Sequence, residues 1–156
     1  MQVGYQSESS TFRNAYLYGA QELRHGGPPR HKAGNRGLVR ALPIDQLLAT
    51  VGMRLNSDAV GGADFTINLT FTDIEEDWLL GLSHRAIRYR KDRRDDGAAA
   101  TVTSTREALS AVIAADVTLD DALAAGDITI DGDAGALRLI IDNLDVFMGG
   151  FPIIEP

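Results

Sequence analysis

Hydrophobic residues near the C-terminus change from a strand period to a helix period within one short segment. Residues 128–130 alternate isoleucine with threonine, whereas the apolar residues after Gly132 recur at helical spacing, at positions 137, 140, 141, 144 and 148. Asp133 is a suitable N-cap, because its carboxylate can accept N–H bonds from the first helical turn. This pattern predicts a strand followed by a helix to Met148, which together can cover a hydrophobic slot.

Alternating apolar and polar residues in the middle of the chain predict four more strands. Residues 65–72 alternate apolar side chains with threonine and asparagine, and residues 78–82 repeat this alternation after an acidic turn, as in a hairpin. Two shorter strands, at 86–90 and 99–104, are expected to extend the hairpin as an antiparallel meander. The strand at 128–130 has no partner adjacent in sequence and is expected to enter the sheet through a long connection.

Helices are predicted before and after these strands. The first runs over residues 9–24, and the second starts with Pro43 at its first position. Capping-box spacing at residues 104–107 opens a third helix, and Thr118 opens a fourth that Gly126 ends. The order helix, four strands, two helices, strand, helix predicts an α+β domain whose helices pack on one sheet.

A stretch rich in glycine, proline and basic residues separates the first helix from the rest of the chain. Residues 25–40 show no hydrophobic periodicity. Such composition is typical of a domain boundary. We therefore expect a helical segment at 1–26, a linker at 27–40 and a main domain at 41–156.

Charge is distributed unevenly over the 156 residues, whose net charge is −7. Residues 24–40 carry five Arg or Lys and no acid, whereas residues 116–155 carry nine acids and one base. The acidic surface disfavours nucleic acid and anionic lipid as partners, and the basic segment is better explained as a solvated linker than as a phosphate site. With no apolar run that could span a membrane and no signal peptide, the chain as it stands is expected to be cytoplasmic, or periplasmic or secreted within a longer exported protein.

Several stretches of the sequence resemble one protein family. The words TREALSAVIAADVTLDDALAAGDI and GDITIDGDAGALRLIIDNLD, in the order of elements above, resemble the sterol carrier protein fold. GYQSESSTFRNAYLYGAQELRHG at residues 4–26 resembles the end of the dimerisation region of bacterial alkyl sulfatases, and LPIDQLLATVGMRLN the start of their sterol-carrier-like C-terminal domain. The ending FMGGFPIIEP is also similar to that family, so the resemblance extends over essentially the whole chain.

This resemblance implies a five-stranded, mostly antiparallel sheet packed with helices around an apolar tunnel. The chain would then be a noncatalytic module that binds a long-chain alkyl or fatty ligand and presents alkyl sulfates to a zinc catalytic domain. The alternative is a structural or dimerisation module with a filled core and no ligand. The residues expected to line the slot are Ile67, Leu69, Leu80, Leu82, Leu109, Ile113, Leu137, Ile140, Ile141, Leu144 and Phe147.

The resemblance implies no catalysis by this chain alone. The catalytic domain of alkyl sulfatases is of the metallo-β-lactamase type and needs clustered histidines and aspartate, and no H-x-H-x-D-H string occurs here. The histidines are His25, His31 and His84, and there is no cysteine. Because a zinc site that activates water needs about three protein ligands on rigid elements, we predict no catalytic residue, no metal site and no cofactor.

The N-terminal helix is the expected association element. Its apolar stripe includes Phe12, Tyr16 and Leu23. Arg13 lies in the sequence segment that resembles the dimerisation region of alkyl sulfatases. An apolar stripe without a cover is an association site. We expect this helix to form a homodimer or to contact the catalytic domain of an alkyl sulfatase.

Basic residues gather around Tyr89, at positions 85, 88, 90, 91, 93 and 94. Their side chains could bind a sulfate, phosphate or carboxylate group. Asp92, Asp95 and Asp96 lie close in sequence, so neutralisation within the hairpin loop is the favoured interpretation.

Overall fold

The structure is a computed structural model that describes residues 2–29, 31–32, 41–150 and 152–154. Contacts divide the chain into two compact units, Met1–Ala33 together with Val146–Pro156, and Gly34–Asp145. Most of the predicted linker at 27–40 lies outside the described residues. Within that stretch β1 (His31–Lys32) pairs antiparallel with β7 (Met148–Gly149), so the first unit contains segments from both ends of the chain.

The larger unit is built on a five-stranded sheet. Its strands are β2 (Phe65–Phe71), β3 (Glu76–Ser83), β4 (Ala86–Lys91), β5 (Ala100–Ser104) and β6 (Ile128–Gly132), in the order β4-β3-β2-β5-β6. Three of the neighbouring pairs are antiparallel and β2–β5 is parallel. The predicted five-stranded, mostly antiparallel sheet is confirmed.

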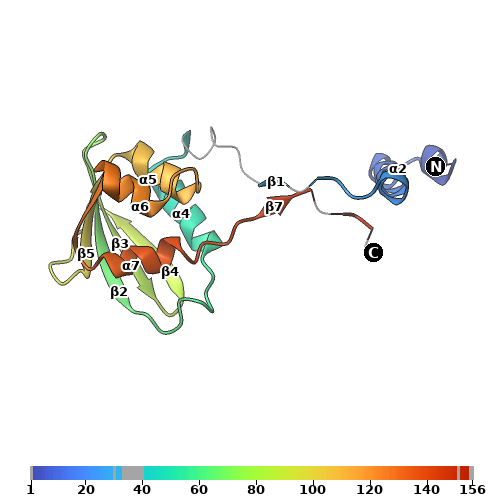
Figure 1. The fold of residues 1–156 in the computed structure, drawn as a ribbon. Coiled ribbons are helices and arrows are strands. Elements are labelled where there is room, and N and C mark those ends of the chain that lie inside the picture. The colour runs from blue at the N-terminus through green and yellow to red at the C-terminus, as the bar shows by residue number, and fades with distance from the viewer. Residues whose placement is uncertain (1, 30, 33–40, 151, 155–156) are drawn as a thin grey trace. The chain divides into compact units, whose positions relative to one another are not determined.

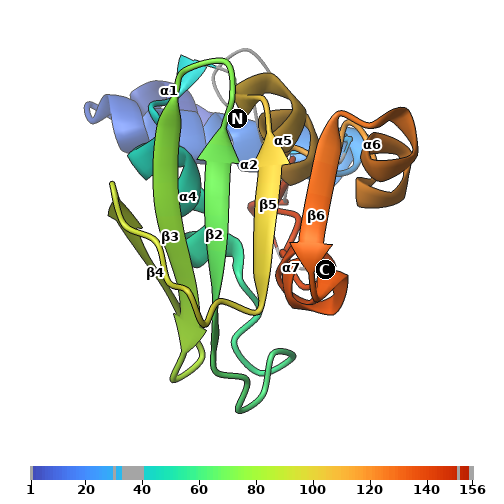
Figure 2. The ribbon, with the colours of Figure 1, turned by 90° about the vertical axis from the view of Figure 1, so that its left-hand side faces the viewer.

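The expected antiparallel meander is wrong at β5. This strand lies beside β2 rather than beside β4, so the connection from β4 crosses the face of the sheet in front of β3 and β2 (Figure 2). Side chains of β2 hold the crossing segment in place: the Thr66 hydroxyl donates to the Asp95 carboxylate at 2.7 Å, and the Asn68 amide donates to the Asp95 carbonyl at 2.9 Å. Alternation cannot distinguish these two positions, because a strand has the same period on either side of β2.

Strand β6 lies at an edge, where it pairs antiparallel with β5, the strand that precedes it in the chain. The connection between them is long, as expected, and contains α5 (Arg106–Ile113) and α6 (Leu119–Ala125). The helices of the larger unit are completed by α4 (Ile44–Arg54) and α7 (Ala134–Ile141), and all four lie on one side of the sheet (Figures 1 and 2).

Capping side chains begin these helices largely where the sequence indicates. The Asp133 carboxylate accepts the Gly135 N–H at 2.8 Å, and the Thr118 hydroxyl oxygen accepts the Asp121 N–H at 3.1 Å. Gly126 ends α6 in the left-handed conformation at φ 78°. The cap of α5, however, is Thr105 rather than Ser104, and Pro43 is the N-cap of α4 rather than its first helical residue.

Helix α7 ends at Ile141, seven residues before the predicted end at Met148. Tertiary hydrogen bonds replace the missing helical turns. The N–H of Asp145 donates to the Arg54 carbonyl at 2.7 Å, and the N–H of Asn56 donates to the Asn143 carbonyl at 2.9 Å. The chain after α7 therefore pairs with the end of α4 instead of continuing the helix.

The core of the larger unit lies between the sheet and its helices. On β2 the side chains of Ile67, Leu69 and Phe71 are buried on this face, whereas Thr66 and Thr70 on the other face are partly exposed. Leu137 and Ile140 of α7 are buried against the same core. Burial of these side chains is the main stabilising contribution, about 1.5–3 kcal/mol for each large aliphatic group.

The smaller unit contains α1 (Gln2–Gln6) and α2 (Ser10–His25). The predicted helix at 9–24 is confirmed by α2. The Arg13 guanidinium donates to the Ser7 carbonyl, from Nε at 3.2 Å and from Nη2 at 2.9 Å, and so joins the two helices. The buried Glu22 carboxylate accepts the N–H groups of Ile153 and Ile154, at 2.8–3.0 Å. Over the described residues, no helix is long and apolar enough to cross a membrane.

Candidate functional site

The candidate site is the apolar centre of the larger unit. Side chains from five elements meet there around a cavity of about 10 Å³, close to the smallest volume that holds one water molecule. The side chains that line it are all aliphatic, and they come from α4, β2, β3, α5 and α7: Leu48, Val51, Leu69, Leu80, Leu109, Ile113, Leu137, Ile140 and Ile141. This centre is therefore closed by its own side chains.

Most of the residues predicted for the slot meet at this cavity. The predicted residues among its lining are those on β2, β3, α5 and α7: Leu69, Leu80, Leu109, Ile113, Leu137, Ile140 and Ile141. The prediction did not include Leu48 and Val51 of α4. Their helical spacing was visible in the sequence, but spacing alone does not show which side of the sheet a helix covers.

The other four predicted residues lie elsewhere. Ile67 and Leu82 are completely buried on neighbouring strands but do not line the cavity. Leu144 is half-buried against the core and forms a β-bridge with Leu55. Phe147 is 55% exposed and belongs to the smaller unit, because the helix that would have turned it toward the core ends at Ile141.

A half-buried arginine, Arg54, lies beside α5, although it does not line the cavity. The Arg54 side chain donates from Nη1 to the Ile113 carbonyl at 2.6 Å and from Nε to the Asp145 carbonyl at 2.8 Å. It thereby connects the C-terminal ends of α4 and α5 with the segment that follows α7. Burial lowers the pKa of Arg54, and the negative charge of Asp145 partly offsets that effect.

The basic cluster around Tyr89 is only partly neutralised, and by acids other than those expected. Ion pairs join Arg85 to Asp58 at 3.1 Å, Arg94 to Asp77 at 2.9 Å, and Lys91 to Glu76. The Lys91 ammonium holds the pKa of Glu76 below its usual value, with the Trp78 indole N–H as a second donor. The three remaining arginines, Arg88, Arg90 and Arg93, are exposed, and no acidic partner for them occurs in the part of the chain that the structure describes.

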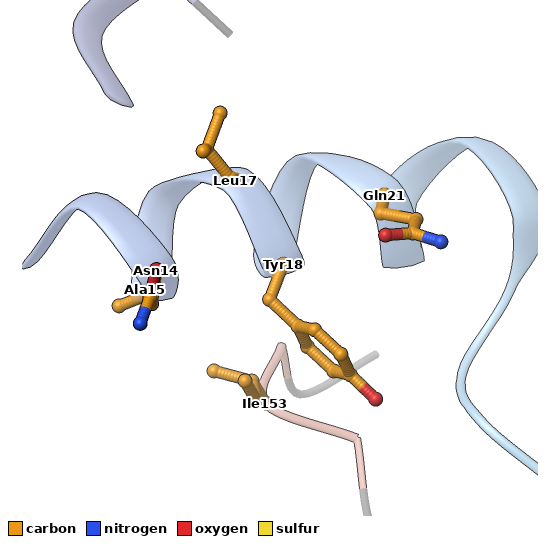
Figure 3. A pocket seen from close by; sticks show the side chains of 6 residues that line it. All are labelled: Asn14, Ala15, Leu17, Tyr18, Gln21 and Ile153. Carbon is orange, nitrogen blue, oxygen red and sulfur yellow. The ribbon is translucent and has the colours of Figure 1, made fainter. Parts of the chain in front are cut away.

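A second hollow lies within the smaller unit, along α2 (Figure 3). It has a volume of about 560 Å³, and its lining combines α2 with the C-terminal segment: Asn14, Ala15, Leu17, Tyr18, Gln21 and Ile153. Among the residues predicted for association, Phe12, Tyr16 and Leu23 are 63%, 52% and 75% exposed. Arg13 is bonded to the Ser7 carbonyl within the unit.

The structure brings together no metal-binding cluster in the ranges that it describes: no three His, Asp or Glu side chains there are placed to hold one ion. His25 ends α2, and His84 lies in the tight turn between β3 and β4. Neither is among residues that line the two hollows.

The fold of the larger unit is one that a known class of proteins shares. A five-stranded mixed sheet with helices on one face is the α+β fold of sterol carrier proteins. The solved structure of the UbiJ-SCP2 ubiquinone synthesis protein shares it with a TM-score of 0.51 and 19% identity, covering 69% of this chain and 93% of that one. This likeness concerns the fold alone.

Sequence comparison then shows the family. Residues 32–156 match the alkyl sulfatase C-terminal family, and the chain belongs to it, as the resemblance implied. The chain is 38% identical over 157 residues to the linear primary-alkylsulfatase of Pseudomonas sp., covering 99% of this chain and 23% of that relative. It is 34% identical over 155 residues to an alkyl/aryl-sulfatase of Saccharomyces cerevisiae, covering 99% and 24%.

A solved alkylsulfatase has the same structure over this region. The stereoselective inverting sec-alkylsulfatase Pisa1 from Pseudomonas sp. superposes with a TM-score of 0.79 and 34% identity, covering 94% of this chain and 23% of that one. The chain thus spans about a quarter of the length of the curated relatives that it matches.

Proposed function

We propose that this chain is the alkyl-chain-binding, noncatalytic part of an alkyl sulfatase, and that it presents alkyl sulfates to a zinc-dependent catalytic domain. The observation that supports the proposal is the aliphatic centre between α4, α5, α7 and the sheet. Its lining carries no polar side chain, so it would select the hydrocarbon part of a substrate. The names of the relatives, which are alkylsulfatases, supply the class of substrate.

Binding of a chain requires the aliphatic centre to expand. Ligand pockets usually have volumes of about 300–1,000 Å³, whereas the cavity here has about 10 Å³. Burial of a dodecyl chain contributes on the order of 9 kcal/mol at about 0.8 kcal/mol per methylene, and association removes about 4 kcal/mol or more. The remainder of about 5 kcal/mol must also cover the displacement of α7, so a dissociation constant of about 0.2 mM or weaker is expected.

Displacement of a fluorescent fatty acid tests the proposal directly. The full chain is titrated with dodecanol, and separately with dodecyl sulfate below its aggregation concentration. We expect displacement by either compound, with half-displacement at about 0.2 mM or higher. No displacement up to the solubility limit would overturn the proposal.

A matched pair of variants locates the binding site. Ile141→Arg places a charge on a half-buried residue that lines the cavity, and it should abolish displacement in a protein that remains folded. Val117→Arg, at a 39% exposed position between α5 and α6, is the control and should leave displacement unchanged. Unfolding of the Ile141→Arg variant would instead favour a purely structural core.

As a second function we propose assembly through α2. In this case the core of the larger unit is filled by its own side chains and binds no alkyl ligand. It is favoured by the exposure of Phe12, Tyr16 and Leu23 on one helix, because monomeric proteins rarely expose a contiguous apolar stripe. The occupant proposed is a second copy of the chain, as the resemblance to a dimerisation region implies. The mass of the full chain in solution should be that of a dimer, and replacement of all three residues by serine should give a monomer. A wild-type monomer would overturn this alternative.

A further inference from the structure

We infer that Arg54 is the head-group residue of the alkyl site, holding the anionic end of a straight-chain amphiphile whose chain lies among the aliphatic side chains of α4, α5 and α7. This inference rests on the proposed function and adds the group that recognises charge. The ligand class is a single-chain anion such as an alkyl sulfate.

The position of Arg54 follows from the helix that carries it. Leu48 and Val51 line the cavity, and Arg54 follows Val51 by three residues, which places it one turn further along the same stripe of α4. Its guanidinium contacts the carbonyl of Ile113, whose side chain also lines the cavity. Arg54 therefore lies at the edge of the aliphatic centre, where a bound chain would place its head group.

The charge of Arg54 is not fully compensated at this position. Both of its hydrogen bonds go to neutral backbone carbonyls, and no carboxylate lies within ion-pair distance of it among the residues that the structure describes. Asp145 acts on it only at longer range. A half-buried cation gains from a counter-ion, because burial has already removed part of its hydration.

The geometry of the guanidinium suits a sulfate or carboxylate. Nε and Nη1 are bonded in the closed structure, whereas Nη2 has no hydrogen-bond partner within the described ranges. Arginine presents parallel N–H groups that two oxygens of an anion can accept. Release of the two carbonyls would free these donors, while the backbone hydrogen bonds from Asp145 to Arg54 and from Asn56 to Asn143 would keep the segment after α7 beside α4.

Arg54 would then serve two states. In the closed state it fastens α4 and α5 to the segment 143–145, beside the β-bridge between Leu55 and Leu144. In the ligand-bound state the anion replaces the carbonyls. Because the same donors serve both states, an anionic ligand competes with the two carbonyls for Arg54, whereas a neutral alkyl chain does not.

Comparison of a charged and a neutral ligand with the same chain tests this assignment. The full-length chain is titrated with dodecyl sulfate, dodecanol and inorganic sulfate, all below aggregation. Wild type should bind dodecyl sulfate about 10-fold more tightly than dodecanol, because a charge-assisted hydrogen bond contributes about this much to the affinity. It should not bind inorganic sulfate at millimolar concentration. In Arg54→Met the preference for dodecyl sulfate should disappear, and dodecanol should bind as well as to wild type or better.

The control is Arg138→Met on α7. Arg138 is exposed and paired with Asp120, away from the cavity lining, so its replacement should keep the 10-fold preference. Arg54→Lys retains the positive charge but lacks the parallel N–H groups of a guanidinium. It should therefore retain part of the preference for dodecyl sulfate. If the thermal transition of Arg54→Met shows that this variant does not fold, Arg54→Lys is used for the comparison instead.

Failure of this assignment can be distinguished from failure of the proposed function. If wild type binds both alkyl compounds equally and Arg54→Met does not change their ratio, Arg54 is not the head-group residue although the alkyl site stands. If wild type binds neither compound, the alkyl site itself is wrong and the assignment falls with it.

Discussion

Both units of the chain contain amphipathic helices, but only the larger unit covers their apolar side chains. On α7, Leu137 and Ile140 are 2% and 1% exposed, whereas on α2 Phe12 and Leu23 are 63% and 75% exposed. The larger unit has a sheet against which its helices pack. Beside its long helix the smaller unit has the short helix α1 and a short C-terminal segment, whose N–H groups Glu22 accepts. The hydrophobic pattern of a helix therefore specifies a face to be buried, not the surface that buries it.

This difference has a functional consequence. A covered face can store a ligand only by opening, whereas an uncovered face is ready to bind another protein surface. The proposed alkyl site accordingly belongs to the larger unit, and the proposed assembly surface to the smaller one. Each comparison below changes one unit and uses the other, or a matched position, as reference.

The largest expected effect is at the backbone of the larger unit. Gly132 has φ +102°, and a Cβ there would lie 2.5 Å from the Ala99 carbonyl oxygen. Gly132→Ala should lower the free energy of unfolding by about 4 kcal/mol or more, from the clash and the left-handed conformation together. The control Gly126→Ala also has positive φ but no atom within 4 Å of its Cβ, and should cost about 1 kcal/mol. Urea unfolding measures both, and equal losses would contradict the close approach.

The next comparison concerns the apolar side chains themselves. Leu137→Ala should cost about 2–5 kcal/mol, because it enlarges a closed cavity. Leu23→Ala on α2 should change the free energy of unfolding by less than about 0.5 kcal/mol. Both are measured by urea unfolding at a concentration where the chain is monomeric. A large loss from Leu23→Ala under that condition would show that α2 is covered after all.

A smaller and local effect is expected in the other unit. Glu22→Ala removes the acceptor of the N–H groups of Ile153 and Ile154. Hydrogen exchange at those two amides should become about 10-fold faster or more, while exchange in the sheet stays unchanged. Glu8→Ala, at an exposed position before α2, is the control. Unchanged protection in Glu22→Ala would contradict the anchoring of the C-terminal segment.

The smallest effect is a pH dependence in the crossing segment of the larger unit. Donation from the Thr66 hydroxyl, and then from the Gly97 N–H, holds the pKa of Asp95 below its usual value. A depressed pKa contributes stability that is present above the unfolded-state pKa and is lost as the pH falls through the folded-state pKa. Wild type should therefore lose its advantage over Asp95→Asn as the pH falls through and below the ordinary range of a carboxyl group. Unfolding curves across that range test this, and Asp96→Asn should run parallel to wild type.

The local elements were largely predictable from the sequence. The alternation in residues 65–72 corresponds to β2, and Asp133, Thr118 and Gly126 cap helices as their side chains or backbone freedom indicate. These features depend on interactions between residues a few positions apart, which a period or a motif records. The same reasoning predicted most of the residues that line the aliphatic centre, because every element contributes its apolar face to one core.

The contacts between residues far apart in the chain were not predictable in this way. Arg54 binds the Asp145 carbonyl 91 residues further along the chain, and Glu22 binds the N–H of Ile153 across 131 residues. Both bonds involve backbone groups of the second partner, and a backbone group leaves no signal in the sequence. The end of α7 at Ile141 depends on the same kind of contact, so the helical spacing of Leu144 and Met148 was misleading.

The sequence by itself determined the five strands of the sheet, the caps at Asp133, Thr118 and Gly126, the aliphatic character of the centre and the family to which the chain belongs. Only the tertiary structure decided that β5 pairs with β2, that α4 contributes to the cavity lining, and that the centre is closed with Arg54 at its edge. The physical reason is that period and capping record interactions along the chain, whereas pairing partners and cavity volume depend on which distant surfaces meet.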